Sequence, residues 1–224
     1  MNIIRLLNVS PKALASPIPK LVQRLYDNYE LDTRKEEDVT KEENTEEDAL
    51  IDAILATDVM ASTMDFLSNK GFFNKDFEEF KKTLKNIWFS VFSREKGKYG
   101  SSGFEHIFLA EKKRGRSIGL HNWIFFHTEE LAKKLNYFGY LRNLDINGKA
   151  AVAMLRFTYN GKIKSSSMFI GTSPELEMAL YTLCFFARPN RYCRLSLNEK
   201  KLGIQTYVWN DRNKELIAAA FPMI

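Results

Sequence analysis

The sequence has few of the residues that build disulfide frameworks and no apolar run of the length that a membrane span requires. Its only cysteines, Cys184 and Cys193, are too few for such a framework. Cys184 lies beside Leu183 and Phe185 in a stretch that reads as a buried helix, so we expect both thiols to be reduced. No stretch approaches the roughly 18 consecutive apolar residues of a transmembrane helix, and none is predicted.

The opening stretch, MNIIRLLNVSPK, holds an apolar patch that Arg5 and Asn8 interrupt. The patch is too short for the hydrophobic core of a signal peptide. We therefore expect a soluble protein of the cytoplasm or nucleus, or a secreted protein if residues are missing from the N-terminus.

The charge balance is only mildly basic. There are 33 Lys and Arg against 28 Asp and Glu, which gives a formal net charge of +5 and a pI near 9.0. An excess of this size only weakly favours an anionic partner. The basic residues are unevenly spread, in two clusters: Lys112, Lys113, Arg114 and Arg116, and then Arg188, Arg191 and Arg194. A solvated turn is the ordinary interpretation of the first cluster, but the same charge would attract a nucleic-acid backbone.

The order of periodic patterns indicates an α+β fold. With 45% hydrophobic residues, a chain of 224 residues can bury a substantial core. We expect helices over Pro19–Tyr29, from Thr45 onward, from Thr57 to Gly71 and over Lys75–Phe92. We expect strands over Phe104–Glu111, Tyr137–Leu144, Ala150–Tyr159, Lys162–Thr172, Arg191–Ser196, Gly203–Trp209 and Leu216–Phe221. The prediction is one domain, with a helical lobe over residues 1–100 and a mostly antiparallel β lobe with interspersed helices over residues 101–224.

Local signals set several boundaries. The stretch Arg34–Asp48 is charged and aperiodic, which predicts an exposed loop, and the acids after Thr45 predict that a helix starts there. Two Asn-Gly pairs predict tight reversals between strands. Ser173 and Pro174 predict the cap and the first residue of a later helix.

The histidines are the first sign of chemistry. The chain has only three, His106, His121 and His127, and they lie in one stretch. Histidine both accepts and donates a proton near neutral pH, so two imidazoles at one place serve as general base and general acid. The strand pattern over Phe104–Glu111 places His106 in the middle of a strand. The helical pattern after Gly119 places His121 at a helix start and His127 on the buried face.

A helix start presents free N–H groups and a positive dipole end, which attract phosphate and favour a neutral imidazole. The ordinary alternative for either His106 or His121 is a buried polar residue satisfied by one hydrogen bond. A metal site fits less well, because no cysteine lies nearby and the spacing of 15 (121 minus 106) is not that of a compact ligand pair.

Four motifs extend this pattern: SSGFEHIFLAE, then GLHNW, then KSSSMFIGTSPELEMALYTLCF, and finally QTYVW. Together they resemble the eukaryotic poly(U)-specific endoribonuclease family, also called the EndoU or XendoU family, from about Pro19 to the C-terminus. The catalytic core is also similar to the coronavirus uridylate-specific endoribonuclease. The resemblance implies metal-stimulated cleavage of single-stranded RNA at uridylates, with Mn²⁺ or Ca²⁺ as the cation and a cyclic phosphate as product.

The family's two histidines and its lysine match His106, His121 and Lys164. Cleavage by the RNA's own 2′-hydroxyl needs a base, an acid, and a cation beside the phosphorane. The helix-start argument predicts His121 as the base and His106 as the acid, the order that the viral relatives also suggest. Lys164 is then the stabilising cation, although by itself it would be read as a solvent-facing strand lysine.

Lys162 is an alternative to Lys164. Many family members place a Pro-Val-Gly-Ser-like segment between the lysine and FIGTSPE, whereas this chain has Ser165–Met168, one residue shorter. Because side chains alternate along a strand, Lys162 and Lys164 would share one face and both lie near the phosphate.

Glu105 and Glu111 match family glutamates that flank the first histidine. In a strand, Glu105 should point away from its neighbour His106, and Glu111 lies at the strand's end. Each glutamate either pairs with a lysine or arginine, or orients the site and binds the divalent cation. No oxygen-ligand loop of recognised spacing is present in the sequence.

Tyr207 matches the family tyrosine placed to stack on the ribose or base, and cross-strand packing is its ordinary alternative. Ser166, Ser167 and Thr206 are unranked candidates for recognising uracil. We expect a monomer whose partner is single-stranded RNA. The alternative function is a catalytically weak RNA-binding protein of the same fold, prompted by the altered segment after Lys164.

Overall fold

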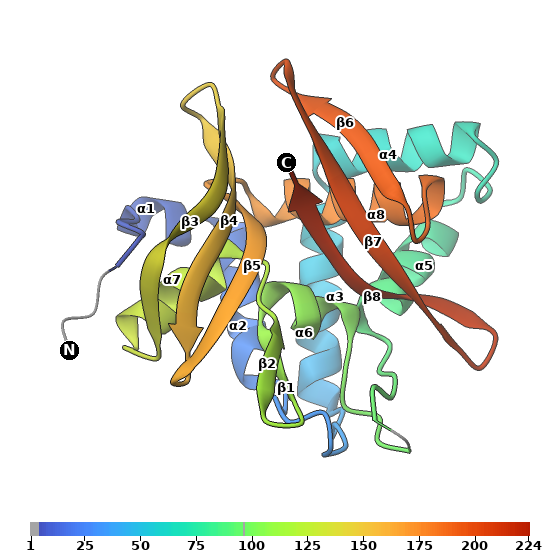
Figure 1. The fold of residues 1–224 in the computed structure, drawn as a ribbon. Coiled ribbons are helices and arrows are strands. Elements are labelled where there is room, and N and C mark those ends of the chain that lie inside the picture. The colour runs from blue at the N-terminus through green and yellow to red at the C-terminus, as the bar shows by residue number, and fades with distance from the viewer. Residues whose placement is uncertain (1–4, 96) are drawn as a thin grey trace.

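The computed structural model describes residues 5–95 and 97–224 and confirms the α+β architecture (Figure 1). The first part of the chain forms the helices α1 (Pro11–Leu14), α2 (Pro17–Arg24), α3 (Lys41–Leu55), α4 (Asp58–Asn69) and α5 (Phe77–Phe89), with a 3-10 turn over Leu25–Asp27. The remainder contains the helices α6 (Gly103–Phe108), α7 (Trp123–Leu131) and α8 (Pro174–Ala187). Its strands are β1 (Ala110–Lys113), β2 (Arg116–Gly119), β3 (Leu135–Ile146), β4 (Ala150–Tyr159), β5 (Lys162–Ile170), β6 (Tyr192–Leu197), β7 (Lys200–Asp211) and β8 (Lys214–Met223).

The strands form a short β1–β2 hairpin and two antiparallel sheets of three, in the orders β3-β4-β5 and β6-β7-β8. Strands β5 and β8 are each the edge of a sheet, and the two edges face each other at the centre of the molecule, with the β1–β2 hairpin beside β5 (Figure 1). The predicted Asn-Gly reversals are confirmed, since Asn147 and Asn160 both adopt positive φ. Groups carried by β5, β8 and the hairpin therefore meet at one junction.

One large buried apolar cluster joins the helices to both sheets. The Trp88 ring of α5 lies 5.9 Å from Phe108 of α6 and 6.4 Å from Tyr181 of α8, and its indole N–H donates to Thr182 at 3.0 Å. Tyr181 in turn lies 6.1 Å from Phe169 of β5. Close packing of this kind holds α6 and β5 in fixed positions. Among the described residues, no helix combines the length and apolarity needed to cross a membrane.

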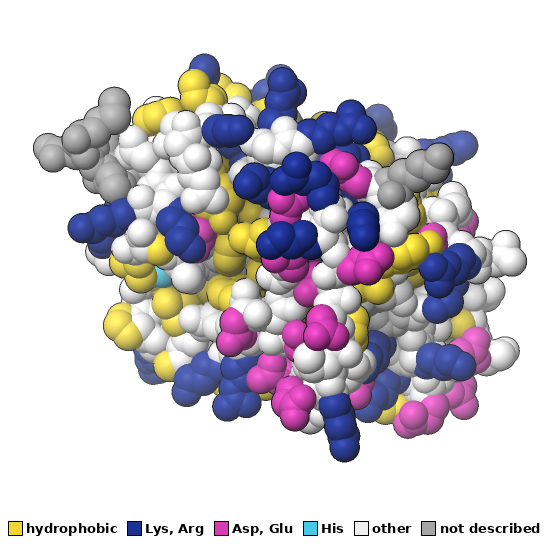
Figure 2. Space-filling view, turned by 90° about the horizontal axis from the view of Figure 1, so that it is seen from below, with side chains coloured by type: hydrophobic (Ala, Val, Ile, Leu, Met, Phe, Trp, Pro, Cys, Tyr) yellow, Lys and Arg dark blue, Asp and Glu magenta, His cyan; other side chains and the backbone are white. Residues whose placement is uncertain are grey.

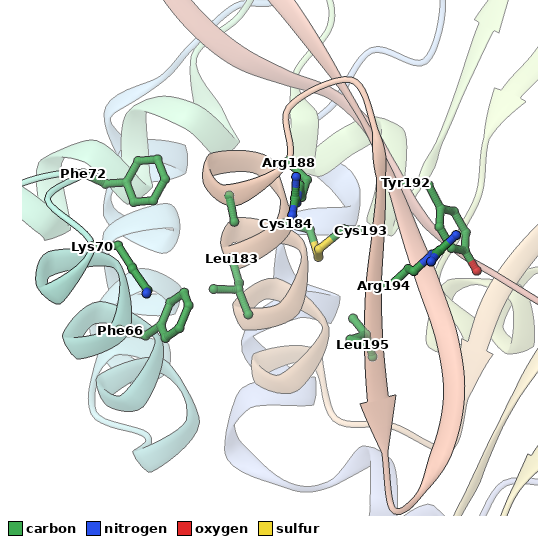
Figure 3. Close-up of a pocket in the computed structure, with 11 residues that line it drawn as sticks. Phe66, Lys70, Phe72, Leu183, Cys184, Arg188, Tyr192, Cys193, Arg194 and Leu195 are labelled. Carbon is green, nitrogen blue, oxygen red and sulfur yellow. A yellow bond between two sulfur atoms is a disulfide. The ribbon is translucent and has the colours of Figure 1, made fainter.

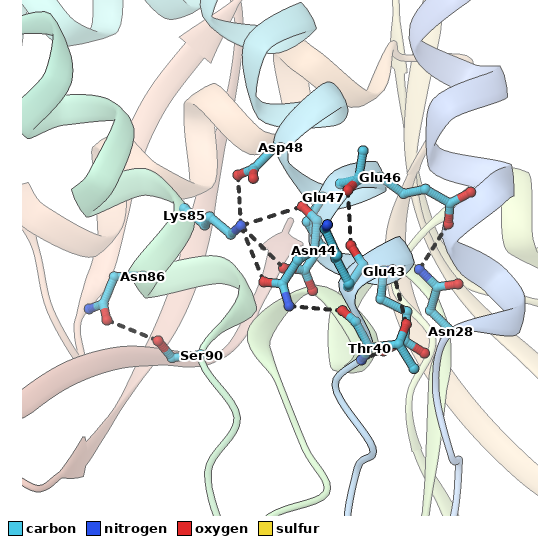
Figure 4. Close-up of polar contacts among 12 residues, drawn as sticks. Asn28, Thr40, Glu43, Asn44, Glu46, Glu47, Asp48, Lys85, Asn86 and Ser90 are labelled. Atoms are coloured by element: carbon cyan, nitrogen blue, oxygen red, sulfur yellow. Dashed lines mark hydrogen bonds and ion pairs between the residues drawn. The ribbon is translucent and has the colours of Figure 1, made fainter.

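The predicted helix start at Thr45 is wrong, because α3 begins five residues earlier with Thr40 as its cap (Figure 4). The Thr40 hydroxyl accepts from the Glu43 N–H at 3.1 Å, and the Glu43 carboxylate accepts from the Thr40 N–H at 2.8 Å. This reciprocal capping box satisfies two N–H groups that the helix end would otherwise leave free. The sequence offers the same signal twice, because both Thr40 and Thr45 are followed by acidic residues, and the first turn of α3 has no apolar residue to distinguish them.

The predicted strand over Phe104–Glu111 is also wrong: residues 103–108 form helix α6. The Ser102 hydroxyl caps this helix by accepting from the Glu105 N–H at 3.1 Å. Every residue of α6 is buried, so the helix shows no polar face by which its period could be recognised. The next helix, α7, ends at Leu131, and Lys133 beyond it adopts a φ of +59°.

The prediction of two reduced thiols is contradicted by a disulfide between Cys184 and Cys193. The chain reverses between the end of α8 and the start of β6, which brings the two Cα atoms to 5.7 Å. That separation lies within the range of a disulfide. Two cysteines are too few for a disulfide framework, but the reversal after α8 brings them together, and no local sequence pattern reports that reversal.

We predict that Thr40→Ala lowers the free energy of unfolding by about 0.5–2 kcal/mol, because it removes the cap of α3. Thr45→Ala is the matched control, since Thr45 lies inside the helix and its hydroxyl only donates to the Lys41 carbonyl. Its effect should stay within about 0.5 kcal/mol. Urea unfolding of both variants measures the difference, and a larger loss in Thr45→Ala would contradict the capping assignment.

Candidate active site

The two histidines of the predicted site meet because the chain folds back onto the end of helix α6. The Leu120 and His121 N–H groups donate to the carbonyls of His106 and Ile107 at 3.0 and 2.9 Å. Gly119 permits this approach, since a Cβ there would lie 2.0 Å from the His106 carbonyl oxygen and φ is +70°. The result places the imidazole rings of His106 and His121 5.7 Å apart, both more than nine-tenths buried.

His121 immediately precedes the cap of α7 and does not belong to the helix itself. The cap is Asn122, whose side-chain oxygen accepts from the N–H groups of Ile124 and Phe125 at 3.0 and 3.2 Å. The Asn122 amide nitrogen donates to the buried Glu177 carboxyl at 3.3 Å. The prediction of a helix start at His121 is thus correct to within two residues, and the cap anchors the backbone that carries the imidazole.

The ring nitrogens of His121 have distinct surroundings. Nδ1 lies 2.9 Å from the Ser167 carbonyl and 3.0 Å from the Ser166 hydroxyl, and that hydroxyl donates to the Leu120 carbonyl at 2.7 Å. A carbonyl only accepts, so Nδ1 carries the proton and Nε2 is left as an acceptor. Burial lowers the pKa of His121 well below its ordinary value, and the positive charges of His106 and Lys164 lower it further. His121 is therefore neutral and suited to accept a proton.

His106 has an ionic partner instead of a carbonyl. Its Nδ1 contacts the Glu111 carboxylate, which Arg94 also holds through Nε at 2.8 and 2.9 Å. Burial opposes ionisation of Glu111, but His106 and Arg94 outweigh it and lower the pKa of Glu111 to about 2. Burial lowers the pKa of His106, and the Glu111 carboxylate opposes that shift. A carboxylate at Nδ1 stabilises an imidazolium, so His106 is suited to donate a proton from Nε2.

Lys164 and Lys162 share a face of β5, as predicted, but differ in burial. The Lys164 ammonium donates to the Ser117 carbonyl of β2 at 3.2 Å, and burial lowers its pKa to about 8 while Glu111 opposes the shift. The Lys162 ammonium is exposed and donates to the carbonyl of Gly115 in the β1–β2 turn. Only Lys164 is close enough to depress the pKa of both histidines. The structure therefore groups Lys164 with His106 and His121, and leaves Lys162 at the rim.

Glu105 and Glu111 have different environments although both are buried. Neither carboxylate oxygen of Glu105 has a hydrogen-bond partner among the described residues, and burial, followed by the charge of Glu111, raises its pKa well above the ordinary value. The prediction that Glu105 points away from His106 by strand alternation is wrong, since both residues lie on helix α6. Within residues 5–95 and 97–224, no three His, Cys, Asp or Glu side chains are grouped to hold a metal ion. With Glu111 already engaged, the two glutamates do not form a cation site as they stand.

The hydroxyls predicted to read uracil lie in three different settings. Ser166 is buried beneath His121, as described above. Thr206 is fully buried on the inner side of β7, with its hydroxyl 3.5 Å from the Arg188 carbonyl, so the structure does not bring it to the site. Ser167 is partly exposed and donates to the Pro222 carbonyl of β8. Of the three, Ser167 is the one that is not buried, and its carbonyl contacts the His121 imidazole.

Phe221 of β8 is the aromatic residue in contact with the histidines, and the sequence analysis missed it. Its ring stacks on His121 with centroids 4.8 Å apart and planes 21° apart. Tyr207 lies one step further away, 6.2 Å from Phe221, and is 47% exposed. Phe221 lies near the end of an apolar strand and resembles a core residue in the sequence, so only the packing of β8 beside β5 reveals its position.

Basic side chains gather on the face of the molecule that carries the β1–β2 turn, with acidic side chains beside them (Figure 2). The turn is the predicted basic cluster, and Arg114 within it contacts the Glu95 carboxylate at 3.8 Å. Between the hairpin and β5 lies a cavity of about 410 Å³ lined by Arg116, Lys162 and Lys164. Its cations suit a phosphate backbone, and Lys164 connects it to the histidines, whose pKa its charge lowers.

Comparisons with known proteins match nearly the whole chain. The family described as Endoribonuclease XendoU matches residues 4–222. The chain is 38% identical over 218 residues to a uridylate-specific endoribonuclease of Bos taurus and 36% identical to one of Homo sapiens. Each match covers 95% of this chain but 52% and 53% of the relative, so the chain spans about half the length of these curated relatives.

A solved structure agrees with the sequence matches. It is described as "The structure of XendoU: a splicing independent snoRNA processing endoribonuclease" and is 35% identical, with a TM-score of 0.77. The match covers 95% of this chain and 80% of that chain. Because the family model, the sequence matches and the solved structure each cover nearly the whole chain, the chain belongs to the XendoU endoribonuclease family.

Proposed function

We propose that the protein is an endoribonuclease that cleaves single-stranded RNA at uridylates and leaves 2′,3′-cyclic phosphate and 5′-hydroxyl ends. The observation that carries the proposal is the pair of imidazoles 5.7 Å apart with different Nδ1 partners. Environments that push two titratable groups toward opposite roles are the usual sign of an acid and base pair. The names of the relatives supply the uridylate preference.

In this proposal His121 is the general base and His106 the general acid. The His121 Nε2 takes the proton of the 2′-hydroxyl, whose oxygen forms a bond to the adjacent phosphorus. The bond from phosphorus to the 5′-oxygen then breaks, and the His106 Nε2–H protonates the departing oxygen. His121 gains one proton and His106 loses one. The enzyme returns to its starting state when His121 releases its proton to solvent and His106 takes one up.

Lys164 supports the proposed reaction by its charge. The phosphorane carries an additional negative charge that the ground state lacks, and a cation fixed beside it stabilises the transition state selectively. Lys164 is fixed by the Ser117 carbonyl and partly desolvated, which strengthens its interaction with an anion.

The substrate base has candidate partners on β8 and β5. The Phe221 ring lies against His121 and offers a surface for the ribose or base, with exposed Tyr207 beyond it. The Ser167 oxygen can accept from the N3–H of uracil, because its own proton is donated to Pro222. We propose Ser167 as the uracil-reading hydroxyl.

Stimulation by Mn²⁺ or Ca²⁺ is part of the proposal through family membership alone. Glu105 and Glu111 do not fit a divalent cation in their present arrangement, as described above. No step of the mechanism is therefore assigned to a metal ion. Cleavage with and without added Mn²⁺ or Ca²⁺ tests whether a cation is required.

We predict that a uridine-containing oligonucleotide is cut on the 3′ side of uridine to a 2′,3′-cyclic phosphate and a 5′-hydroxyl. The same oligonucleotide with a single 2′-deoxyuridine at the cut site should be inert there, because the nucleophile is missing. Mass spectrometry of the products, with and without added Mn²⁺ or Ca²⁺, is the measurement. A linear 5′-phosphate would indicate attack by water, and binding without cleavage would support the alternative of a catalytically weak RNA-binding protein.

We predict that Lys164→Ala lowers kcat by about 10² or more, since it removes a group that stabilises developing charge. Lys162→Ala, the matched control two residues away on the same face, should mainly weaken RNA binding and flatten its salt dependence by about one phosphate contact. Steady-state kinetics at several salt concentrations separate the two effects. The reverse pattern would assign the transition-state role to Lys162.

A further inference from the structure

The outer face of the β6-β7-β8 sheet carries a row of side chains that begins at the candidate active site. Gln205 of β7 is paired with Phe221 of β8 on one side and with Tyr192 of β6 on the other. Directly paired residues of neighbouring strands project from the same face. The row therefore runs from His121 through Phe221 and Gln205 to Tyr192.

Tyr192 is held in a defined place at the far end of this row. Its ring lies over Gly203 of β7, where a Cβ would meet the ring carbons at 2.1 and 2.3 Å. The side chain is nevertheless 43% exposed. Covering a strand glycine is a known structural use of an aromatic residue, and here it leaves part of the ring exposed on the same face as Phe221.

Arg194 lies two residues after Tyr192 and shares its face of β6. Figure 3 shows both side chains on the side of β6 that points away from Leu183 of α8 and Phe66 of α4. Tyr192 and Arg194 also border the cavity of about 790 Å³ between α4, α8 and β6, whose other lining residues include Leu183 and Phe66. On the outer face, the paired stretches 192–196, 201–207 and 219–223 contain no Asp or Glu, so the charge of Arg194 is not offset there.

We propose that Tyr192 and Arg194 form a second nucleotide subsite, in which Tyr192 stacks on a base flanking the cleaved uridylate and Arg194 contacts a backbone phosphate. Neighbouring strands are about 4.8 Å apart, so Tyr192 stands about 10 Å from Phe221 across the sheet, within reach of a neighbouring nucleotide. Stacking aromatics beside a cation are the common means of binding a single strand without reading its sequence. The inference rests on the proposed function, because a flanking nucleotide reaches Tyr192 only if the RNA is cleaved beside His121.

The test compares a long and a short substrate. A uridine-containing decanucleotide reaches the second subsite, and the methyl ester of uridine 3′-phosphate, a cleavable diester without any flanking base, does not. Loss of one stacked base costs about 1–3 kcal/mol, which is roughly 5- to 150-fold. Tyr192→Ala should therefore raise KM for the decanucleotide by at least about 5-fold. The KM for the short substrate should not change, so the ratio of the long-substrate KM to the short-substrate KM should rise by the same factor. Tyr192→Phe should retain the wild-type ratio, because the ring remains.

Three further variants make the test specific. Gly203→Ala keeps the tyrosine but displaces its ring, and it should reproduce the KM change of Tyr192→Ala. Tyr140→Ala is the matched control, since Tyr140 is 64% exposed on β3 of the other sheet. It should leave both substrates at wild-type values. Arg194→Ala should weaken binding of the decanucleotide and flatten its salt dependence.

The outcomes separate this inference from the proposed function. An unchanged KM ratio in Tyr192→Ala, or an equal loss on both substrates, would overturn the subsite. If the wild-type protein cleaves neither substrate, the proposed function fails, and equilibrium binding of the 2′-deoxyuridine decanucleotide then decides the subsite. Wild-type affinity in Tyr192→Ala would overturn the subsite in that assay as well.

Discussion

The candidate site depends on two backbone hydrogen bonds between the segment before α7 and the end of α6. They join the N–H groups of Leu120 and His121 to the carbonyls of His106 and Ile107, so each histidine helps to place the other. Gly119 and Leu120 both adopt left-handed backbone angles to make this contact. For Leu120, a residue with a Cβ, that conformation costs roughly 1–3 kcal/mol, and the buried surroundings of α6 must offset it. The fold therefore holds a strained reversal where the two imidazoles meet.

The same junction gives the two imidazoles different chemistry. Edge strand β5 presents the Ser167 carbonyl to one histidine, whereas β1 presents the Glu111 carboxylate to the other. A carbonyl fixes the tautomer without adding charge, whereas the Glu111 carboxylate favours a protonated ring and opposes the lowering of the His106 pKa by burial and by Arg94. Two identical side chains thus acquire complementary proton-transfer roles in the proposed mechanism through their partners alone.

Much of the fold could be predicted from the sequence wherever a few neighbouring residues determine a turn or a helix end. The Asn-Gly reversals and the helices capped by Thr57 and Ser173 follow short-range rules, and they occur where expected. Helix α6 was mistaken for a strand because it is buried on every side and has no polar face. Phe221 and the disulfide were missed because they depend on which strands and turns become neighbours, which periodicity does not report.

The clustering of the chain's three histidines already singled out His106 and His121, but Lys164 was identified from the family motif alone. A lysine two residues earlier satisfies the same strand pattern, and only burial in the folded chain distinguishes Lys164 from Lys162. Thr206 shows the converse, since it lies next to exposed Tyr207 in the sequence yet on the opposite, buried side of β7.

The central claim is that the partners of Nδ1 make His121 the base and His106 the acid. The most direct measurement uses a substrate whose departing 5′-oxygen is replaced by sulfur, because a thiolate leaves without first being protonated. His106→Ala should lose about 10²- to 10⁴-fold on the oxygen substrate and recover most of that loss on the sulfur substrate. His121→Ala should remain impaired on both. Recovery of His121→Ala on the sulfur substrate, with His106→Ala still impaired, would contradict the account.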